Sequence, residues 1–91
     1  MYTLYKRPIQ LETLHIVQYL HAYGITLLPD TIVERSFPSC ITELPAIYCE
    51  NQWYMGLSQV LVFYETKSGI QKLSEKAEEW KKENPRYTIK K

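Results

Sequence analysis

Two cysteines are the side chains of this chain best suited to covalent chemistry. Cys40 and Cys49 are too far apart in the sequence to form a C-x-x-C motif, the usual arrangement for thiol–disulfide exchange. Two interpretations stay open: a displaced redox pair, with Cys40 in a loop and Cys49 in a strand, or two small apolar side chains, as most free cysteines are. Two cysteines cannot make a disulfide framework, which favours a reducing compartment.

The histidines and glutamates do not form a recognisable site. His15 and His21 fall on one predicted helix, where their spacing points them about 120° apart, and metal ions need converging ligands. Glu12, Glu43 and Glu50 have no spacing that pairs two carboxylates. We therefore predict no metal site and no hydrolase chemistry.

Composition bounds the class of protein. The 91 residues suffice for one small domain, and 11 basic against 10 acidic residues leave no strong field to attract nucleic acid or a membrane. No apolar stretch reaches the length of a membrane-spanning helix and the N-terminus lacks the order of a secretory signal, so we expect a soluble cytoplasmic protein. Eight tyrosines, two tryptophans and two phenylalanines suggest an aromatic recognition surface.

The first half of the chain predicts a strand, a helix and a second strand. Residues 2–5 are rich in strand-forming types. A helix is expected from Pro8, because apolar residues then recur at three-residue steps until Gly24, a typical C-terminal cap. Residues 31–37 are β-branched and aromatic enough for a strand.

The second half predicts a hairpin and two helices. Strands over 45–49 and 53–55 flank Glu50-Asn51, where asparagine tolerates the positive φ of a tight turn. Ser58 is a candidate N-cap for a helix that ends near Gly69. An amphipathic helix over 70–83 and a basic tail over 86–91 complete the chain.

This order predicts an α/β fold, β-α-β-β-β-α, with a mixed four-stranded sheet and an extra C-terminal helix. A helical crossover requires the first two strands to be parallel and the connection between them to be right-handed, whereas the hairpin adds antiparallel strands. Residues 1–69 form the expected domain, and 70–91 pack on it or extend it.

Two segments resemble glutaredoxins, members of the thioredoxin-like superfamily. Tyr2-Thr3-Leu4-Tyr5-Lys6-Arg7-Pro8 is similar to their first strand and turn, and the spacing from Pro8 to Gly24 matches theirs. Counting from Pro45 in place of the family's cis-proline, Gly56 falls on the second glycine of the pair before the last helix. The resemblance covers residues 2–66 and implies a cis bond at Pro45.

The chain departs from the family where the chemistry should be. Gln10-Leu11-Glu12-Thr13 stands in place of C-P-Y-C, so neither thiol is present and exchange by that route is excluded. The family's second helix is missing or reduced to a turn, which uncovers one face of the sheet. Either the helix over 70–83 or a partner would then cover that face.

The resemblance implies a binding site around the proline, with the backbone of Leu44 free to pair with an extended peptide. Ser58 lies near the family's site for the glutathione carboxylate, although helix capping is the simpler role. Trp80 could dock into another subunit or pack internally. The predicted binding residues are Pro8, Gln10, Thr13, Leu44, Pro45, Trp53, Gly56, Ser58 and Trp80.

The leading hypothesis is a non-catalytic, glutaredoxin-like protein-interaction module that binds another protein, as a component or regulator of a larger assembly such as a phage assembly, or as a homo-oligomer. No cofactor is expected, with glutathione the one ligand left open. The main alternative is a thiol–disulfide oxidoreductase or glutathione-binding protein that uses Cys40 or Cys49. A nucleic-acid accessory protein acting through the basic tail is a third.

Overall fold

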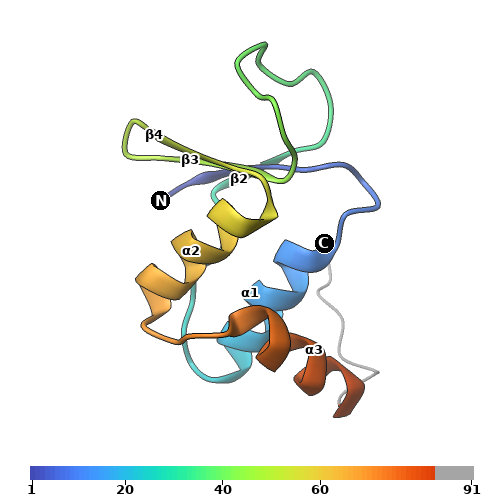
Figure 1. Ribbon diagram of the computed structural model, residues 1–91, viewed down its shortest axis with the longest axis vertical. Coiled ribbons are helices and arrows are strands. Elements are labelled where there is room, and N and C mark those ends of the chain that lie inside the picture. Colours follow the sequence, from blue (N-terminus) through green and yellow to red (C-terminus); the bar gives the residue numbers. More distant parts are fainter. Residues whose placement is uncertain (84–91) are drawn as a thin grey trace.

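The computed structural model describes residues 1–83, which form four strands and three helices (Figure 1). In chain order these are β1 (Thr3–Tyr5), α1 (Glu12–Ala22), β2 (Thr31–Val33), β3 (Ala46–Cys49), β4 (Gln52–Met55), α2 (Leu57–Ser68) and α3 (Leu73–Glu83). The predicted element order is confirmed, and the basic tail over 86–91 lies outside the described residues.

The strands form one mixed sheet in the order β2-β1-β3-β4. β1 pairs in parallel with β2 across the α1 crossover, and it pairs antiparallel with β3, which pairs antiparallel with β4. The predicted four-stranded mixed sheet is therefore confirmed, and β1 is one of its two central strands.

All three helices lie on one face of this sheet (Figure 1). α2 contacts β3 and β4, whereas α3 packs on α1 and α2. The core between the helices and the sheet contains Leu4, Leu20, Ile47 and Tyr64, each fully buried. The suggestion that the helix over 70–83 covers the face left open by a missing second helix is wrong, because α3 joins the helix layer.

All three predicted helix starts are wrong. α3 begins at Leu73 and not at residue 70, because Lys72 has a positive φ of +56° that a helix does not accommodate. α1 begins at Glu12, because Pro8 lies in a turn in which the Gln10 N–H donates to the Arg7 carbonyl oxygen at 3.0 Å. α2 begins at Leu57 after Gly56, whose φ is +85°, and no side chain caps it. Ser58 is therefore an exposed residue inside the first turn.

The turn residues behave as predicted at the hairpin and at two helix ends. Glu50 and Asn51 both have positive φ, which a two-residue hairpin turn requires. Gly24 follows α1 with φ +83°, and Gly69 ends α2 in the left-handed region. These residues set the register of β3 and β4 and the ends of the helices around the sheet.

The connector between β2 and β3 contains no helix. The second strand stops at Val33, earlier than the predicted residue 37, and Ser36 has a positive φ that a strand does not accommodate. Residues 34–45 then form a loop that projects from the sheet (Figure 1). Among the described helices, none is long and apolar enough to cross a membrane.

Candidate functional site

The loop before β3 meets the loop before α1 at one side chain, that of Gln10. Its Nε2 donates to the Leu44 carbonyl oxygen at 3.2 Å, and its Oε1 accepts from the Arg7 backbone N–H at 2.9 Å. The Leu44–Pro45 peptide bond is cis, as expected. The expectation of a free Leu44 carbonyl is wrong, because the Gln10 amide occupies that acceptor.

A second side chain lies against the start of α2. A Cβ built on Gly56 would be 2.5 Å from Oε2 of Glu43, so the Glu43 carboxylate sits beside this glycine at the N-terminal end of the helix. The positive end of a helix dipole favours an anion. Within this structure, the chain's own carboxylate occupies the region where the sequence suggested an external one.

A pocket of about 480 Å³ opens between the loop before α1 and the loop before β3. Arg7, Gln10 and Glu43 contribute its polar groups, and Ile9, Phe37 and Ile41 contribute apolar ones. Ile9 is 88% exposed. The pocket is a wide, mixed surface with no cysteine among its lining residues, so it can bind a ligand but does not provide the thiol that disulfide exchange needs.

The two cysteines are free and lie in different environments. Cys40 is exposed in the connector, whereas Cys49 is buried and its Sγ donates to the Met1 carbonyl oxygen at 3.4 Å. Cys49 ends β3 at the far end from Pro45, about 13 Å along a strand that rises 3.3 Å per residue. This separation gives no support to a redox pair beside the proline.

The face of the sheet opposite the helices carries a cluster of aromatic side chains. Strand side chains alternate between faces, and Leu4, Ile47 and Tyr54 belong to the core or pack against it on the helix side. Tyr5, Tyr48 and Trp53 therefore face the other way. We call this second surface the open face.

The rings of the open face contact one another. The Trp53 ring centroid lies 5.4 Å from that of Tyr5 and 4.7 Å from that of Tyr48. Met55 extends the cluster, and its Sδ accepts a hydrogen bond from the Thr42 hydroxyl at 3.5 Å. All four side chains are half-buried although no helix of residues 1–83 lies over them. The open face is thus an uncharged, aromatic surface that is accessible to a partner.

The remaining predicted binding residues do not join one site. Thr13 is buried, with its hydroxyl lacking a hydrogen-bond partner. Pro8 is exposed in the turn before α1, and Ser58 is exposed in the first turn of helix α2. Trp80 is half-buried against Tyr19, with ring centroids 6.2 Å apart. The structure therefore brings together Gln10, Leu44, Pro45 and Gly56 near the proline, and places Trp53 on the open face.

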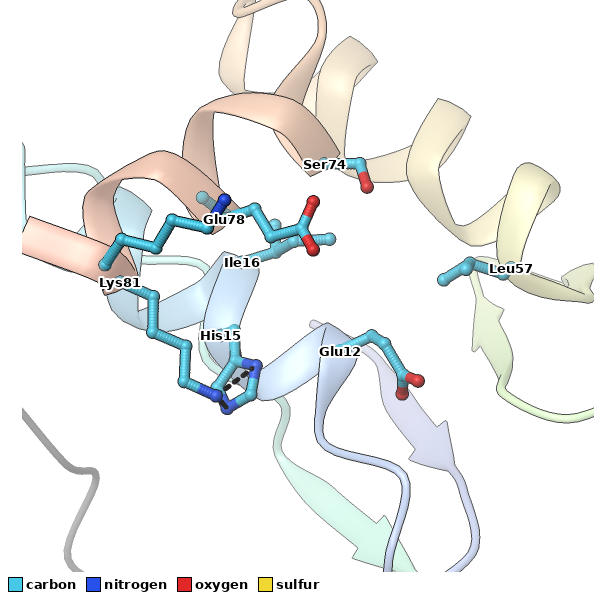
Figure 2. A pocket seen from close by; sticks show the side chains of 9 residues that line it. Glu12, His15, Ile16, Leu57, Ser74, Glu78 and Lys81 are labelled. Carbon is cyan, nitrogen blue, oxygen red and sulfur yellow. Dashed lines mark hydrogen bonds between the residues drawn. The ribbon is translucent and has the colours of Figure 1, made fainter. Parts of the chain in front are cut away.

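A second pocket, of about 560 Å³, lies between α1, α3 and the start of α2 (Figure 2). Its apolar lining consists of Ile16 and Ala77, which are buried, and Leu57, which is exposed. Figure 2 shows the carboxylate of Glu78 and the hydroxyl of Ser74 directed toward the hollow. Its polar lining consists of exposed or half-buried side chains from amphipathic helices, so it is a groove between helices.

His15 and Lys81 meet at one side of this groove. Lys81 Nζ lies 3.0 Å from Nε2 of the His15 ring (Figure 2). Burial, and then the positive charge of Lys81, lower the pKa of His15, whereas Glu12 opposes this shift. The neutral form of His15 is therefore favoured where it joins α1 to α3. The described residues contain no group of three or more metal-ligating side chains.

One buried charge was not predicted from the sequence. The Lys6 side chain is fully buried, and its Nζ lies 2.7 Å from Oε2 of Glu34. It also donates to the Arg7 carbonyl oxygen at 3.2 Å. No spacing rule connects Lys6 with Glu34, since the two are brought together by the parallel pairing of β1 and β2. This ion pair ties the first residue of the connector, Glu34, to the end of β1.

No family model, curated protein or solved structure matches this chain.

Proposed function

We propose that this protein is a non-catalytic, glutaredoxin-like interaction module that binds another protein through its open face. The single observation that carries the proposal is the cluster of Tyr5, Tyr48, Trp53 and Met55 on a sheet face that no helix of residues 1–83 covers. Aromatic residues and methionine are enriched at protein interfaces and charged residues are depleted at their centres. The cluster has that composition.

The order of elements supports the glutaredoxin-like part of the proposal. The chain has the β-α-β-β-β-α order, the sheet order β2-β1-β3-β4 and a cis-proline before β3. The element order was predicted from the sequence pattern, and the cis-proline from the resemblance of residues 2–66. The absence of a helix in residues 34–45 leaves the sheet face beside this loop open, and this is the face that we assign to the partner.

The contacts around the proline support a non-catalytic role. Gln10 replaces the nucleophilic thiol and donates to the Leu44 carbonyl, the acceptor that an extended ligand would otherwise use. Glu43 occupies the N-terminal end of α2, where its negative charge disfavours a second carboxylate. Glutathione would have to displace both groups, so we propose that the chain acts without it.

The experiment is a comparison of proteins captured by the parent and by two open-face variants. Tagged parent, Tyr5→Ser and Trp53→Ala are used as baits in an extract of the source organism, with capture measured by quantitative mass spectrometry. We expect one protein to be enriched by the parent and lost with both variants. Its binding is then measured with the purified pair, where each variant should weaken the affinity at least tenfold, as for an interface hot spot.

Val62→Ala is the matched control. Val62 is 50% exposed on α2, within the helix layer, so its truncation removes an exposed apolar side chain without touching the open face. Equal binding by Tyr5→Ser and by Val62→Ala would refute the open face as the site. Reduction of a glutathione-mixed disulfide that disappears in Cys40→Ser or Cys49→Ser would refute the non-catalytic role.

A further inference from the structure

The outer strand β4 presents unpaired backbone groups at one edge of the sheet. Gly56 N–H donates to the Pro45 carbonyl oxygen, and Cys49 opposes Gln52 next to the two-residue turn. Hydrogen-bonded and non-hydrogen-bonded pairs alternate along an antiparallel ladder, so Tyr54 bonds inward to β3. The N–H and C=O groups of Trp53 and Met55 must therefore point outward, away from β3.

This edge lacks the features that usually prevent pairing. Exposed edge strands are normally protected by lysines, prolines, bulges or a covering segment. β4 has the sequence Gln52-Trp53-Tyr54-Met55, without a charge or a proline, and the backbone hydrogen bonds of residues 1–83 give the outward groups no partner. The opposite edge, β2, has only three residues and is followed at once by the charged Glu34 and Arg35.

We propose that two copies of this chain pair through β4 in an antiparallel, two-fold symmetric dimer centred on Tyr54. Each β4 strand has two residues with outward backbone groups, Trp53 and Met55. Both residues can form hydrogen bonds to the second copy only when Trp53 of one copy faces Met55 of the other. That register makes four backbone hydrogen bonds, two for each Trp53–Met55 pair. Centring on Trp53 or on Met55 would place the turn or α2 opposite an outward group and forfeit bonds.

The side chains suit the same register. Directly opposed residues on one face of an antiparallel pair are about 5 Å apart, so the indole of Trp53 meets the thioether of Met55 from the second copy. Sulfur–aromatic contacts of this kind are favourable. On the helix side, Tyr54 meets its own copy across the two-fold axis. All three side chains are half-buried in the single chain and would gain burial.

Charge does not oppose the pairing. The three residues at its centre are uncharged, and the whole chain has a formal net charge of +1, so two copies repel one another weakly. The result is an eight-stranded sheet in which the two open faces join into one continuous surface. This inference goes beyond the proposed function, because it concerns a second copy at the edge and not a partner on the face.

The test combines molar mass with amide exchange. Sedimentation equilibrium of the full chain from low to high micromolar concentration should show the mass rise from 10.8 kDa toward twice that value. Amide exchange measured by NMR tests the register. When about nine-tenths of the chains are paired, exchange of the Trp53 and Met55 amides should be about tenfold slower, in proportion to the remaining monomer. The Tyr54 amide, already bonded to β3, serves as the internal reference.

Two variants should block pairing at the outer edge of β4 and keep the hydrogen bonds between β3 and β4. Met55→Pro deletes an outward N–H, which a proline on an edge strand tolerates. Met55→Lys places a charge in the pairing region and serves if the proline disturbs folding. Both should remain monomeric with the parent's circular dichroism spectrum, whereas Val62→Lys, a charge on exposed α2, should dimerise like the parent.

The outcomes separate this proposal from the proposed function. A parent that stays monomeric throughout, or that dimerises while the Trp53 and Met55 amides exchange at unchanged rates, overturns the edge pairing. Dimerisation retained in Met55→Pro and Met55→Lys overturns it as well. Partner binding that fails in Tyr5→Ser but leaves the dimer intact would show the face and the edge to be independent, because Tyr5 lies on β1, away from this edge.

Discussion

A methyl group at Gly56 is expected to destabilise the junction between β4 and α2 more than the same change at another positive-φ glycine. Gly56 has φ +85° and ψ 156°, a combination reserved almost entirely for glycine, and forcing a residue with a Cβ into such a region costs about 1–3 kcal/mol. The added Cβ would also lie 2.5 Å from Glu43 Oε2, so the carboxylate would have to move.

The net magnitude includes the unfolded chain. Alanine restricts the unfolded state and returns about 0.4–1 kcal/mol relative to glycine. Displacement of the flexible Glu43 side chain adds a smaller penalty to the backbone cost. Gly56→Ala should therefore lower the free energy of unfolding by about 2 kcal/mol, which for a domain of this size is about 10 °C in Tm.

Gly69→Ala is the matched control. Gly69 also has a positive φ, +74°, but its ψ of 11° is the left-handed region that other residues can occupy, and nothing lies within 4 Å of a built Cβ. Urea unfolding followed by circular dichroism should show a loss at Gly69 of under about 1 kcal/mol. In a Glu43→Ala background, Gly56→Ala should lose less than in the parent, and the difference measures the steric contact. Equal losses at the two glycines would refute this reasoning.

Three further changes test the interior. Glu34→Gln should destabilise the fold by about 3 kcal/mol because it leaves the Lys6 ammonium buried without a counter-ion, whereas Lys6→Met should cost less, and denaturant unfolding that reversed this order would contradict the ion-pair assignment. Thr13→Val should stabilise by about 1 kcal/mol, since it removes a buried hydroxyl without a partner, and a loss of stability would imply a bond formed in solution. Burial and Lys81 lower the pKa of His15 in the folded chain, so below about pH 6.5 the unfolded chain binds a proton more readily than the folded chain does. The free energy of unfolding should therefore be unaffected by His15 above about pH 6.5 and should fall as the pH drops below that value. His15→Gln should flatten this slope in urea titrations at several pH values.

The parts of the fold that the sequence predicts well are those set by neighbouring residues. The apolar spacing of α1, the strand-forming residues of β1 and the turn at Glu50-Asn51 each depend on a few consecutive positions. Once these elements are placed, the crossover and the hairpin determine which strands are parallel. The sheet order then follows with little freedom.

The parts that could not be predicted join residues that are distant in the chain. Gln10 reaches the Leu44 carbonyl 34 positions away, and Lys6 reaches Glu34 through the pairing of β1 with β2. Helix starts fail for a similar reason: Pro8 and Ser58 have suitable chemistry, but the turn before α1 and the backbone of Gly56 decide where the helices begin. Local preference is overridden wherever a tertiary contact fixes the backbone.

The aromatic residues on the open face are the feature of the sheet that its fold does not require. The four-stranded sheet needs apolar side chains only on its helix side, and the solvent side of such a sheet is normally polar. Threonine at Tyr5, Tyr48 and Trp53 would leave the core intact, because these rings are only half-buried and lie outside the core cluster. Ring contacts across the strands contribute to the stability of the sheet, but the core does not require three aromatic rings on this face. Burial against a second protein, as we propose, would account for them, because it would remove their whole apolar surface from water.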